Sequence, residues 1–349
     1  MAMFAAESPD IRSIDDSQRD IWNQYVVGNT GHSVYHLYAW RDVIREVFAG
    51  ETHYLAAFSA GRIVGVLPLG RLKSRLFGDF LVSLPYFNYG GILADSEQVM
   101  EALWQRAGLL ARNLGASHIE MRHVTPMSAS AVRADKVTMV LTLPASSEVL
   151  LKQLPSKLRS QIKRPQREGA VTQCGGMELL PEFYAVFARN MRDLGTPVYP
   201  QTLFASILQR FPQAARLLVV RLGGKPVAAG FLIGHNGMME IPWASSLREA
   251  NHLSVNMLLY WDALKYSVEQ GYGSFDFGRS TLDSGTFRFK KQWGAQPRQL
   301  YWHYWMKNGG GPPQINHANP KYHLLISAWQ RLPLWFANWL GPRLIRHLP

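Results

Sequence analysis

The chain has 349 residues, of which 47% are hydrophobic and 18% charged, a composition that suits two folded domains of about 150 residues each. Its single cysteine, Cys174, excludes an intrachain disulfide and favours a reducing compartment. The formal net charge of +12 indicates polyanionic partners.

The N-terminal residues carry acidic side chains where a signal peptide would carry a basic and then an apolar segment. No apolar run approaches the roughly 20 residues that a membrane-spanning helix needs. We therefore expect a cytoplasmic protein.

Two stretches lack acidic residues while carrying many basic ones: the segment between Glu148 and Glu168, and everything after Asp283. Both predict contact with a polyanion.

An internal repeat is visible along the chain. HYLAAFSAGRIVGVLPLGRLKS reads as two strands joined by a tight turn, and RLLVVRLGGKPVAAGFLIG aligns with it, placing Gly61 on Gly224. Each hairpin is followed by an amphipathic helix, a glycine and a short strand, which places Glu120 on Asp276. The repeat predicts two tandem α/β units. The alternative is a chance likeness between two common hairpins.

Two further segments have a distinctive composition. LPSKLRSQIKRPQREGAV, from Leu154, predicts a basic helix that Pro165 ends or kinks after Arg164. Residues 307–349 begin as a Gly/Pro linker and continue with Leu, Trp and Phe interrupted by Arg. This tail predicts either peripheral contact with anionic lipid at the inner membrane or a helix that packs back on its domain.

The segment with the most chemistry is FDFGRSTLDSGTFRFKKQWGAQP, from Phe275 to Pro297. We expect a strand to Gly278, a polar loop, and then an extended cationic strand on which Lys290 and Phe289 point to opposite sides. Such a ribbon would bind a phosphate-bearing group. Alternatively, its aromatic side chains belong to the core and its cations are simply solvated.

This segment, together with NMLLYWDALKYS from Asn256, resembles the C-terminal signature of the Fem-type peptidyltransferase family, in particular the FemAB-like proteins associated with PEP-CTERM/exosortase loci. The basic segment from Leu154 and YFNYGGILAD from Tyr86 resemble further parts of that family. The resemblance runs from about Trp22 to Tyr304. The long helical-hairpin insertion of the tRNA-using staphylococcal members is absent.

The resemblance implies an α/β (α+β) fold with a tandem duplication of GNAT-like domains, each a mixed, mainly antiparallel sheet flanked by helices. We expect these domains at 1–150 and 151–306, followed by the linker and basic tail at 307–349. The resemblance also implies transfer of an aminoacyl group from tRNA to an amine of a cell-wall precursor. Phe289 and Lys290 would occupy the family's aromatic-lysine position beside the acyl donor.

Amine acylation needs a base, a donor for the developing oxyanion and a fixed acyl carrier. We predict Lys290, Asp276 and Arg288 as catalytic, with Asp283 and His252 as further candidates for the base, and Asp276 alternatively as a structural hydrogen-bond partner. The predicted substrate-binding residues are Phe289, Lys291, Trp293, Arg279, Asn256, Tyr86, Tyr89, Asp95, Lys163 and Arg164. No spacing of ligating residues indicates a metal site.

The donor and the acceptor stay open. Residues 248–256 contain no glycine, which disfavours acetyl-CoA, although Ser254 is expected to cap the next helix and leave amides for an anion. We expect no tightly bound cofactor. The expected donor is aminoacyl-tRNA or acyl-CoA. The expected acceptor is a nucleotide- or lipid-linked envelope precursor, either peptidoglycan peptide or exopolysaccharide sugar. The alternatives are a non-catalytic scaffold for a polyanionic glycan and an acetyl-CoA-dependent N-acetyltransferase. No DNA-reading motif is visible.

Overall fold

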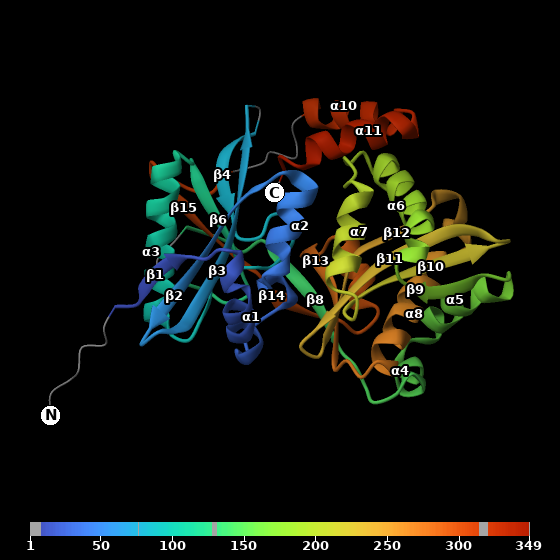
Figure 1. Ribbon diagram of the computed structural model, residues 1–349. Coiled ribbons are helices and arrows are strands. Elements are labelled where there is room, and N and C mark those ends of the chain that lie inside the picture. The colour runs from blue at the N-terminus through green and yellow to red at the C-terminus, as the bar shows by residue number, and fades with distance from the viewer. Residues whose placement is uncertain (1–7, 76, 128–130, 314–319, 349) are drawn as a thin grey trace. The chain divides into compact units, whose positions relative to one another are not determined.

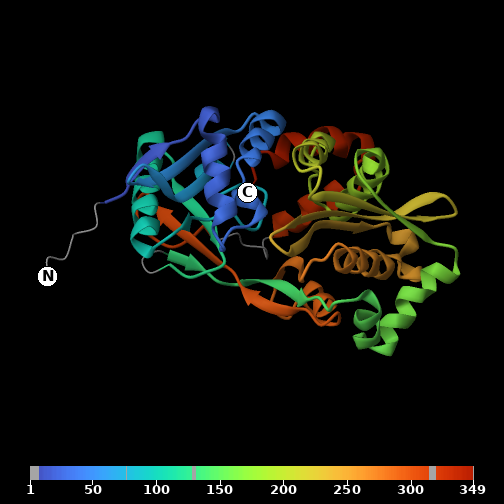
Figure 2. The same ribbon diagram turned by 60° about the horizontal axis from the view of Figure 1, so that its bottom comes forward.

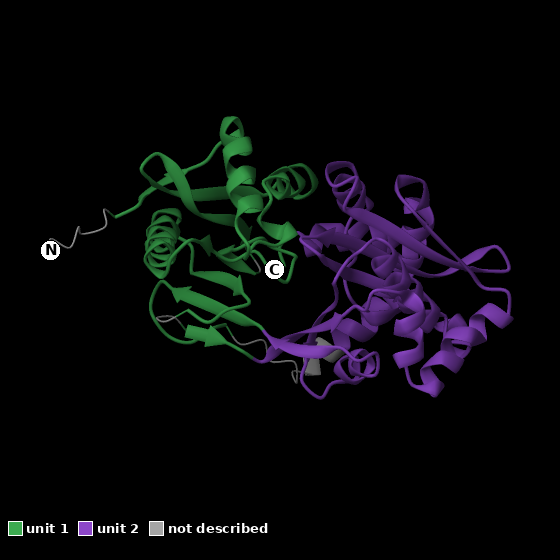
Figure 3. Ribbon diagram, turned by 90° about the horizontal axis from the view of Figure 1, so that it is seen from below, with its two compact units in different colours: residues 1–134, 300–313, 347–349 green, residues 135–299, 314–346 purple. Residues whose placement is uncertain are grey.

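The computed structural model describes residues 8–75, 77–127, 131–313 and 320–348 (Figure 1). The chain divides into two compact units (Figure 3). Unit 1 comprises residues 1–134, 300–313 and 347–349, and unit 2 comprises residues 135–299 and 314–346. No helix in the described part of the chain is both long and apolar enough to cross a membrane.

Unit 1 is built on an eight-stranded mixed sheet in the order β1-β2-β3-β4-β6-β15-β7, with β5 paired to β3. Its strands are β1 (Asp10–Ser13), β2 (Glu51–Ser59), β3 (Arg62–Ser74), β4 (Gly78–Val82), β5 (Leu93–Ala94), β6 (His118–His123), β7 (Ala131–Arg133) and β15 (Tyr301–Met306). Its helices are η1 (Asp16–Gln18), α1 (Arg19–Gly28), η2 (Val34–His36), α2 (Ala39–Phe48) and α3 (Glu97–Leu114).

Helices cover both faces of this sheet because alternate strand residues are apolar on each side. Leu55 and Leu67 pack beneath α3, which Ser96 begins by accepting a hydrogen bond from the amide of Val99. Tyr54 and Ala56 point the other way and pack with Trp22 of α1. The sheet is therefore the central layer of unit 1.

Unit 2 is built on a seven-stranded sheet in the order β14-β8-β13-β12-β11-β10-β9. Its strands are β8 (Lys136–Thr142), β9 (Val171–Gly175), β10 (Ala215–Leu222), β11 (Lys225–His235), β12 (Met238–Ser246), β13 (Ser274–Thr281) and β14 (Gln296–Gln299). Its helices are α4 (Ser147–Gln153), α5 (Ser156–Arg167), η3 (Met177–Leu179), α6 (Leu180–Leu194), α7 (Gln201–Arg210), η4 (Arg248–Leu253), α8 (Val255–Glu269), α9 (Gly285–Lys291), α10 (Pro320–Gln330) and α11 (Leu334–Ile345).

This sheet too lies between two helical layers. Leu218 and Val220 of β10 belong to the core beneath α8, whereas Phe231 of β11 packs edge-on against Phe183 of α6. Figure 2 shows α8 on one side of the strands and α6 and α7 on the other. Helices α10 and α11 pack in turn against α6.

The two sheets have matching strand orders, and each contains one strand from the far half of the chain. β15 follows unit 2 in sequence but pairs with β6 and β7 of unit 1, while β8 precedes most of unit 2 and lies between β13 and β14. The unit boundaries therefore fall at 134/135 and 299/300 rather than near 150 and 306. Most of the predicted tail likewise belongs to unit 2 as α10 and α11.

The basic helix of the sequence prediction is α5, and it runs through Pro165 to Arg167 instead of ending after Arg164. Pro165 is buried, and its carbonyl accepts the amides of Glu168 and Ala170. Proline has no amide proton, so the helix loses one hydrogen-bond donor at this position. Burial of the proline ring removes apolar surface from water, and this stabilisation offsets part of the lost hydrogen-bond energy.

Candidate functional site

The site lies where β12 and β13 part. These strands pair in parallel only from Met238–Glu240 opposite Ser274–Asp276. Beyond that point β12 continues against β11, and β13 continues against β8 with a register shift between Asp276 and Arg279. Parallel strands that separate leave main-chain groups facing each other without ladder bonds, so an extended ligand could pair with them.

A sharp turn and a short helix close this end of the sheet. Gly278 has φ +78, a conformation that favours glycine, and the Oγ of Ser284 accepts the amide of Phe287 to begin α9. The prediction of an extended ribbon is therefore wrong: residues 285–291 are helical. Phe287 and Lys290 are three residues apart and share the buried side of α9, because helix neighbours lie at this spacing.

Lys290 is the central residue of the site. Its Nζ donates to the carbonyl oxygens of Gly278 at 2.8 Å and Arg279 at 2.9 Å, and only 7% of the residue is exposed. Burial lowers the pKa of Lys290 to about 8, against the opposing fields of Asp276 and Glu240. An amine with a pKa near 8 can change protonation near neutral pH, and a lysine perturbed in this way by burial and neighbouring carboxylates is typical of functional sites.

Two buried carboxylates accompany this lysine. Glu240 and Asp276 face each other across the last pair of the parallel ladder, and they are 6% and 1% exposed. The Oδ1 of Asp276 accepts the hydroxyl of Thr138 at 2.5 Å and the amide of Gly278 at 2.7 Å. Asp276 therefore holds the Gly278 turn, and through it the two carbonyls that bind Lys290.

Sequence reasoning missed Glu240 and Thr138. Glu240 is the only acid in the otherwise apolar start of β12, MMEIPW. A charged residue within an apolar strand is a signal of a paired or functional group, because burying a lone charge is unfavourable. Thr138 gives no such signal, since threonine is ordinary in a strand.

The aromatic residues of the segment pack together rather than forming an open stacking surface. Phe289 lies edge-on to Tyr260 of α8, with ring centroids 5.0 Å apart, and Trp293 is 2% exposed. Burial raises the pKa of Tyr260 to about 12. Phe289 is half-buried beside Lys290, so of the two predicted aromatic binders in this segment, Phe289 and Trp293, only Phe289 keeps partial access to solvent.

The other predicted cations of this segment do not join Lys290. Arg288 and Lys291 are on the exposed side of α9, and Arg288 donates to the carbonyl of Asp283 at 2.6 Å. Arg279 contributes its carbonyl to Lys290, while the residue itself is exposed. Of the predicted catalytic residues, the structure brings together Lys290 and Asp276, and leaves Arg288 apart.

The start of α8 differs from expectation. Ser254 has φ +63 and its side chain makes no cap hydrogen bond, so the predicted side-chain cap is wrong. The amide of Met257 instead bonds the carbonyl of Ser254. Asn256 lies half-buried in the first turn. Lys163 and Arg164 are exposed on α5, which packs on α8.

The predicted binding residues of the first half belong to unit 1, where they have structural contacts. Tyr86 is buried with φ +76, and its ring lies 4.2 Å from that of Phe48. Tyr89 packs beside Tyr35, with centroids 5.8 Å apart. Asp95 accepts the hydroxyl of Tyr25 at 2.9 Å.

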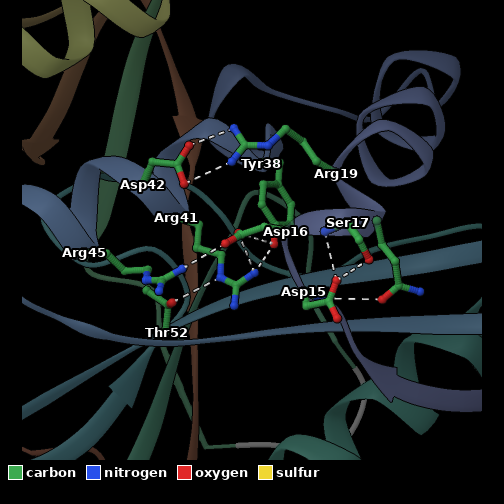
Figure 4. A network of polar contacts seen from close by, with 10 residues as sticks. Asp15, Asp16, Ser17, Arg19, Tyr38, Arg41, Asp42, Arg45 and Thr52 are labelled. Carbon is green, nitrogen blue, oxygen red and sulfur yellow. Dashed lines mark hydrogen bonds and ion pairs between the residues drawn. The ribbon is translucent and has the colours of Figure 1, made fainter.

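A surface network ties α1 and α2 of unit 1 together (Figure 4). Arg19 donates to both carboxylate oxygens of Asp42, at 2.7 and 3.1 Å. Arg41 forms an ion pair with the carboxylate of Asp16 at 3.1 Å. The guanidinium of Arg41 also reaches Thr52. These cations are engaged within unit 1.

No group of three His, Cys, Asp or Glu side chains suited to a metal ion occurs among the residues that the structure describes.

Comparison with known proteins is consistent with this geometry. Residues 154–291 match the sequence profile described as "Acetyltransferase (GNAT) domain". A crystal structure of FemX superposes with TM-score 0.65 at 14% identity, covering 84% of this chain and 96% of that one. A tandem GNAT protein from the clavulanic acid biosynthesis pathway superposes with TM-score 0.52 at 14% identity, covering 87% of this chain and 100% of the other. The chain has a tandem GNAT fold.

The C-terminal domain of a putative lysylphosphatidylglycerol synthetase from Agrobacterium fabrum shares this GNAT fold, with TM-score 0.53, 16% identity, and coverage of 82% of this chain and 92% of that one. Among curated protein sequences, none matches this chain significantly. The likenesses confirm the predicted fold class of a GNAT-type acyltransferase. At these identities they describe the fold alone.

Proposed function

We propose that this chain is a Fem-type N-acyltransferase that uses the Lys290 site of unit 2 to transfer an acyl or aminoacyl group to an amine. The observation that carries the proposal is the buried Nζ of Lys290, held by two carbonyls at the point where parallel strands separate. An ammonium has three protons, and two are used here. The third can stabilise the oxyanion of the acyl donor or a phosphate of its carrier.

In the proposed reaction the acceptor amine attacks the acyl carbon, a C–N bond forms, and the bond from the acyl carbon to the donor's sulfur or oxygen breaks. The proton lost by the amine passes to a carboxylate of the site and from there to the departing sulfur or oxygen, so that the carrier leaves as a thiol or a hydroxyl. We assign this acceptance to Glu240, because Asp276 already accepts two hydrogen bonds through Oδ1. No covalent enzyme intermediate is needed, since positioning the two reactants supplies much of the acceleration.

For the acceptor we propose an amine of a nucleotide- or lipid-linked envelope precursor, either a peptidoglycan peptide or an exopolysaccharide sugar, encountered in the cytoplasm. The fold likeness to FemX supports this choice. For the donor we propose a carrier with several phosphates, either aminoacyl-tRNA or acyl-CoA. Helix α5 supports a polyanionic donor, because its exposed side carries Lys157, Lys163, Arg164 and Arg167 and its twelve residues contain no acid.

The test is a transfer assay that crosses both donor types with amine-bearing precursors. We expect product with one donor, and a loss of at least about 100-fold in Lys290→Met, a size typical of removing one oxyanion donor. Lys225→Met is the matched control, because Lys225 is exposed at the β10–β11 turn of the same unit. Equal activity of Lys290→Met and wild type would refute the assigned site. Binding of a polyanionic glycan without transfer to any acceptor would instead indicate a scaffold.

A further inference from the structure

Helix α11 packs on the rest of unit 2 through a narrow strip of small and apolar residues. Ala337, Gly341 and Ile345 are buried at a spacing of four residues. A Cβ at Gly341 would lie 2.7 Å from the backbone nitrogen of Val198, so only glycine permits this close approach. Gly195, at the end of α6, meets Ile326 of α10 in the same manner. The two helices are thus docked on the body of unit 2.

The opposite side of α11 is exposed and has an unusual composition. Since successive helix residues are turned by about 100°, Trp335, Trp339, Arg343 and Arg346 point away from the buried side. Trp335 is 71% exposed and Trp339 is 52% exposed. Helix α10, which packs against α6 as α11 does, carries Leu324 and Leu325, which are 73% and 67% exposed. We call these six residues the outer face.

The aromatic rings of this outer face pack against neighbouring side chains. Phe336 lies 5.5 Å from Trp335 and 5.6 Å from Trp339 between ring centroids, the latter pair stacked. The guanidinium of Arg343 lies 4.1 Å from the centre of the Trp339 ring and donates to the Trp339 carbonyl. Trp335 and Trp339 are the only exposed tryptophans in the described part of the chain. A preformed aromatic and cationic surface of this kind is suited to binding.

We propose that the outer face docks the protein on the surface of an anionic lipid bilayer. Tryptophan and arginine side by side suit the headgroup layer, where the indole ring is half-immersed and the guanidinium meets lipid phosphate. Neither helix contains an acid, and none occurs anywhere after Asp283, so nothing in the outer face repels an anionic membrane. The proposal is independent of the reaction assigned to Lys290.

Two other occupants fit this outer face less well. A second copy of the chain would bring Arg343 and Arg346 against the same cations, because a two-fold interface is self-complementary. An RNA would find the two arginines and stacking rings, but it would leave Leu324 and Leu325 of the outer face without a counterpart. A bilayer surface satisfies the apolar and the cationic residues together.

The experiment is co-sedimentation of the full chain with vesicles of phosphatidylglycerol and phosphatidylcholine in equal parts, beside vesicles of phosphatidylcholine alone. We expect binding to the anionic vesicles that weakens with salt. Trp335→Ser/Trp339→Ser should lower partitioning at least about 10-fold, and Arg343→Gln/Arg346→Gln should remove the preference for anionic lipid. The matched control is Val27→Ser/Leu109→Ser, which removes exposed apolar side chains of unit 1.

Folding and assembly are checked in parallel by thermal melting and by light scattering in solution. A docked outer face also predicts quenching of wild-type tryptophan fluorescence by brominated lipid, with the quenching reduced in the double tryptophan variant. The proposal is overturned if folded Trp335→Ser/Trp339→Ser binds anionic vesicles as wild type does. It is also overturned if wild type does not bind them, or if the tryptophan changes alter only the oligomeric state.

Discussion

Glu120 and Asp276 occupy the same position in the two units of this chain. Each is the last residue of a short parallel pairing, Glu120 opposite Val82 and Asp276 opposite Glu240. Both are buried, and both lie near a cation. In unit 1 the cation is Arg122, which stays charged. In unit 2 it is Lys290, whose pKa burial lowers to about 8. One copy thus keeps a permanent ion pair, and the other has a group that titrates.

The stability of the protein should reflect this buried amine. Between about pH 8 and pH 10.5 the unfolded chain holds a proton on Lys290 that the folded protein has lost, so the contribution of Lys290 to stability rises with pH in that window. Relative to Lys290→Met, wild type should gain up to about 3 kcal/mol between pH 7 and pH 10.5. Urea unfolding of both proteins at the two pH values measures the difference. An unchanged difference would show that Lys290 has an ordinary pKa.

The field of Asp276 should be visible in the pH dependence of transfer. If the ammonium form of Lys290 acts, kcat/KM falls as pH rises through about 8. Asp276→Asn keeps an oxygen for Thr138 and Gly278 but removes a charge that raises the pKa of Lys290. The alkaline limb should then move to lower pH. An unmoved limb, with activity retained, would mean that Asp276 acts only by holding the Gly278 turn.

The buried ion pair of unit 1 should be a structural element. Arg122 donates to Glu120 at 2.8 Å, and Tyr304 donates to the other oxygen of that carboxylate at 2.7 Å. Arg122→Met leaves a buried charge without its main partner and should cost about 3–5 kcal/mol. Tyr304→Phe removes one hydrogen bond and should cost about 1–2 kcal/mol. Chemical denaturation ranks the two. A milder effect of Arg122→Met than of Tyr304→Phe would contradict the ion-pair reading.

Gly91 should tolerate no side chain. A Cβ there would lie 1.7 Å from Cδ2 of His123, whose Nε2 accepts the amide of Ile92 at 2.7 Å. Gly91→Ala must displace this buried ring and break its bond, so we expect a loss of at least about 2 kcal/mol. Gly28→Ala is the control, because no atom lies within 4 Å of its added Cβ. The control should be neutral or stabilising by up to about 1 kcal/mol in thermal melting. Equal melting temperatures would contradict the close contact.

The fold class could be predicted because it depends on sequence patterns within short stretches of the chain. The hairpins at Gly61 and Gly224, and the helices that follow them, depend on turn chemistry and apolar periodicity within short stretches. The match of Glu120 with Asp276 also followed from this local alignment, and the structure places both at equivalent ladder positions. Lys290 could be singled out by the resemblance of its segment to a known signature.

The remaining features depend on contacts between residues far apart in sequence. GTFRFKK alternates like a strand, yet it forms a helix because Ser284 caps it and because Phe287 and Lys290 are buried together on one side. The sequences of β8 and β15 do not show which sheet each strand joins, since an apolar strand can pair with the sheet of either unit. Glu240 is 50 residues from Lys290 in sequence. Only packing places its carboxylate close enough to raise the pKa of the amine, and only burial lowers that pKa to about 8.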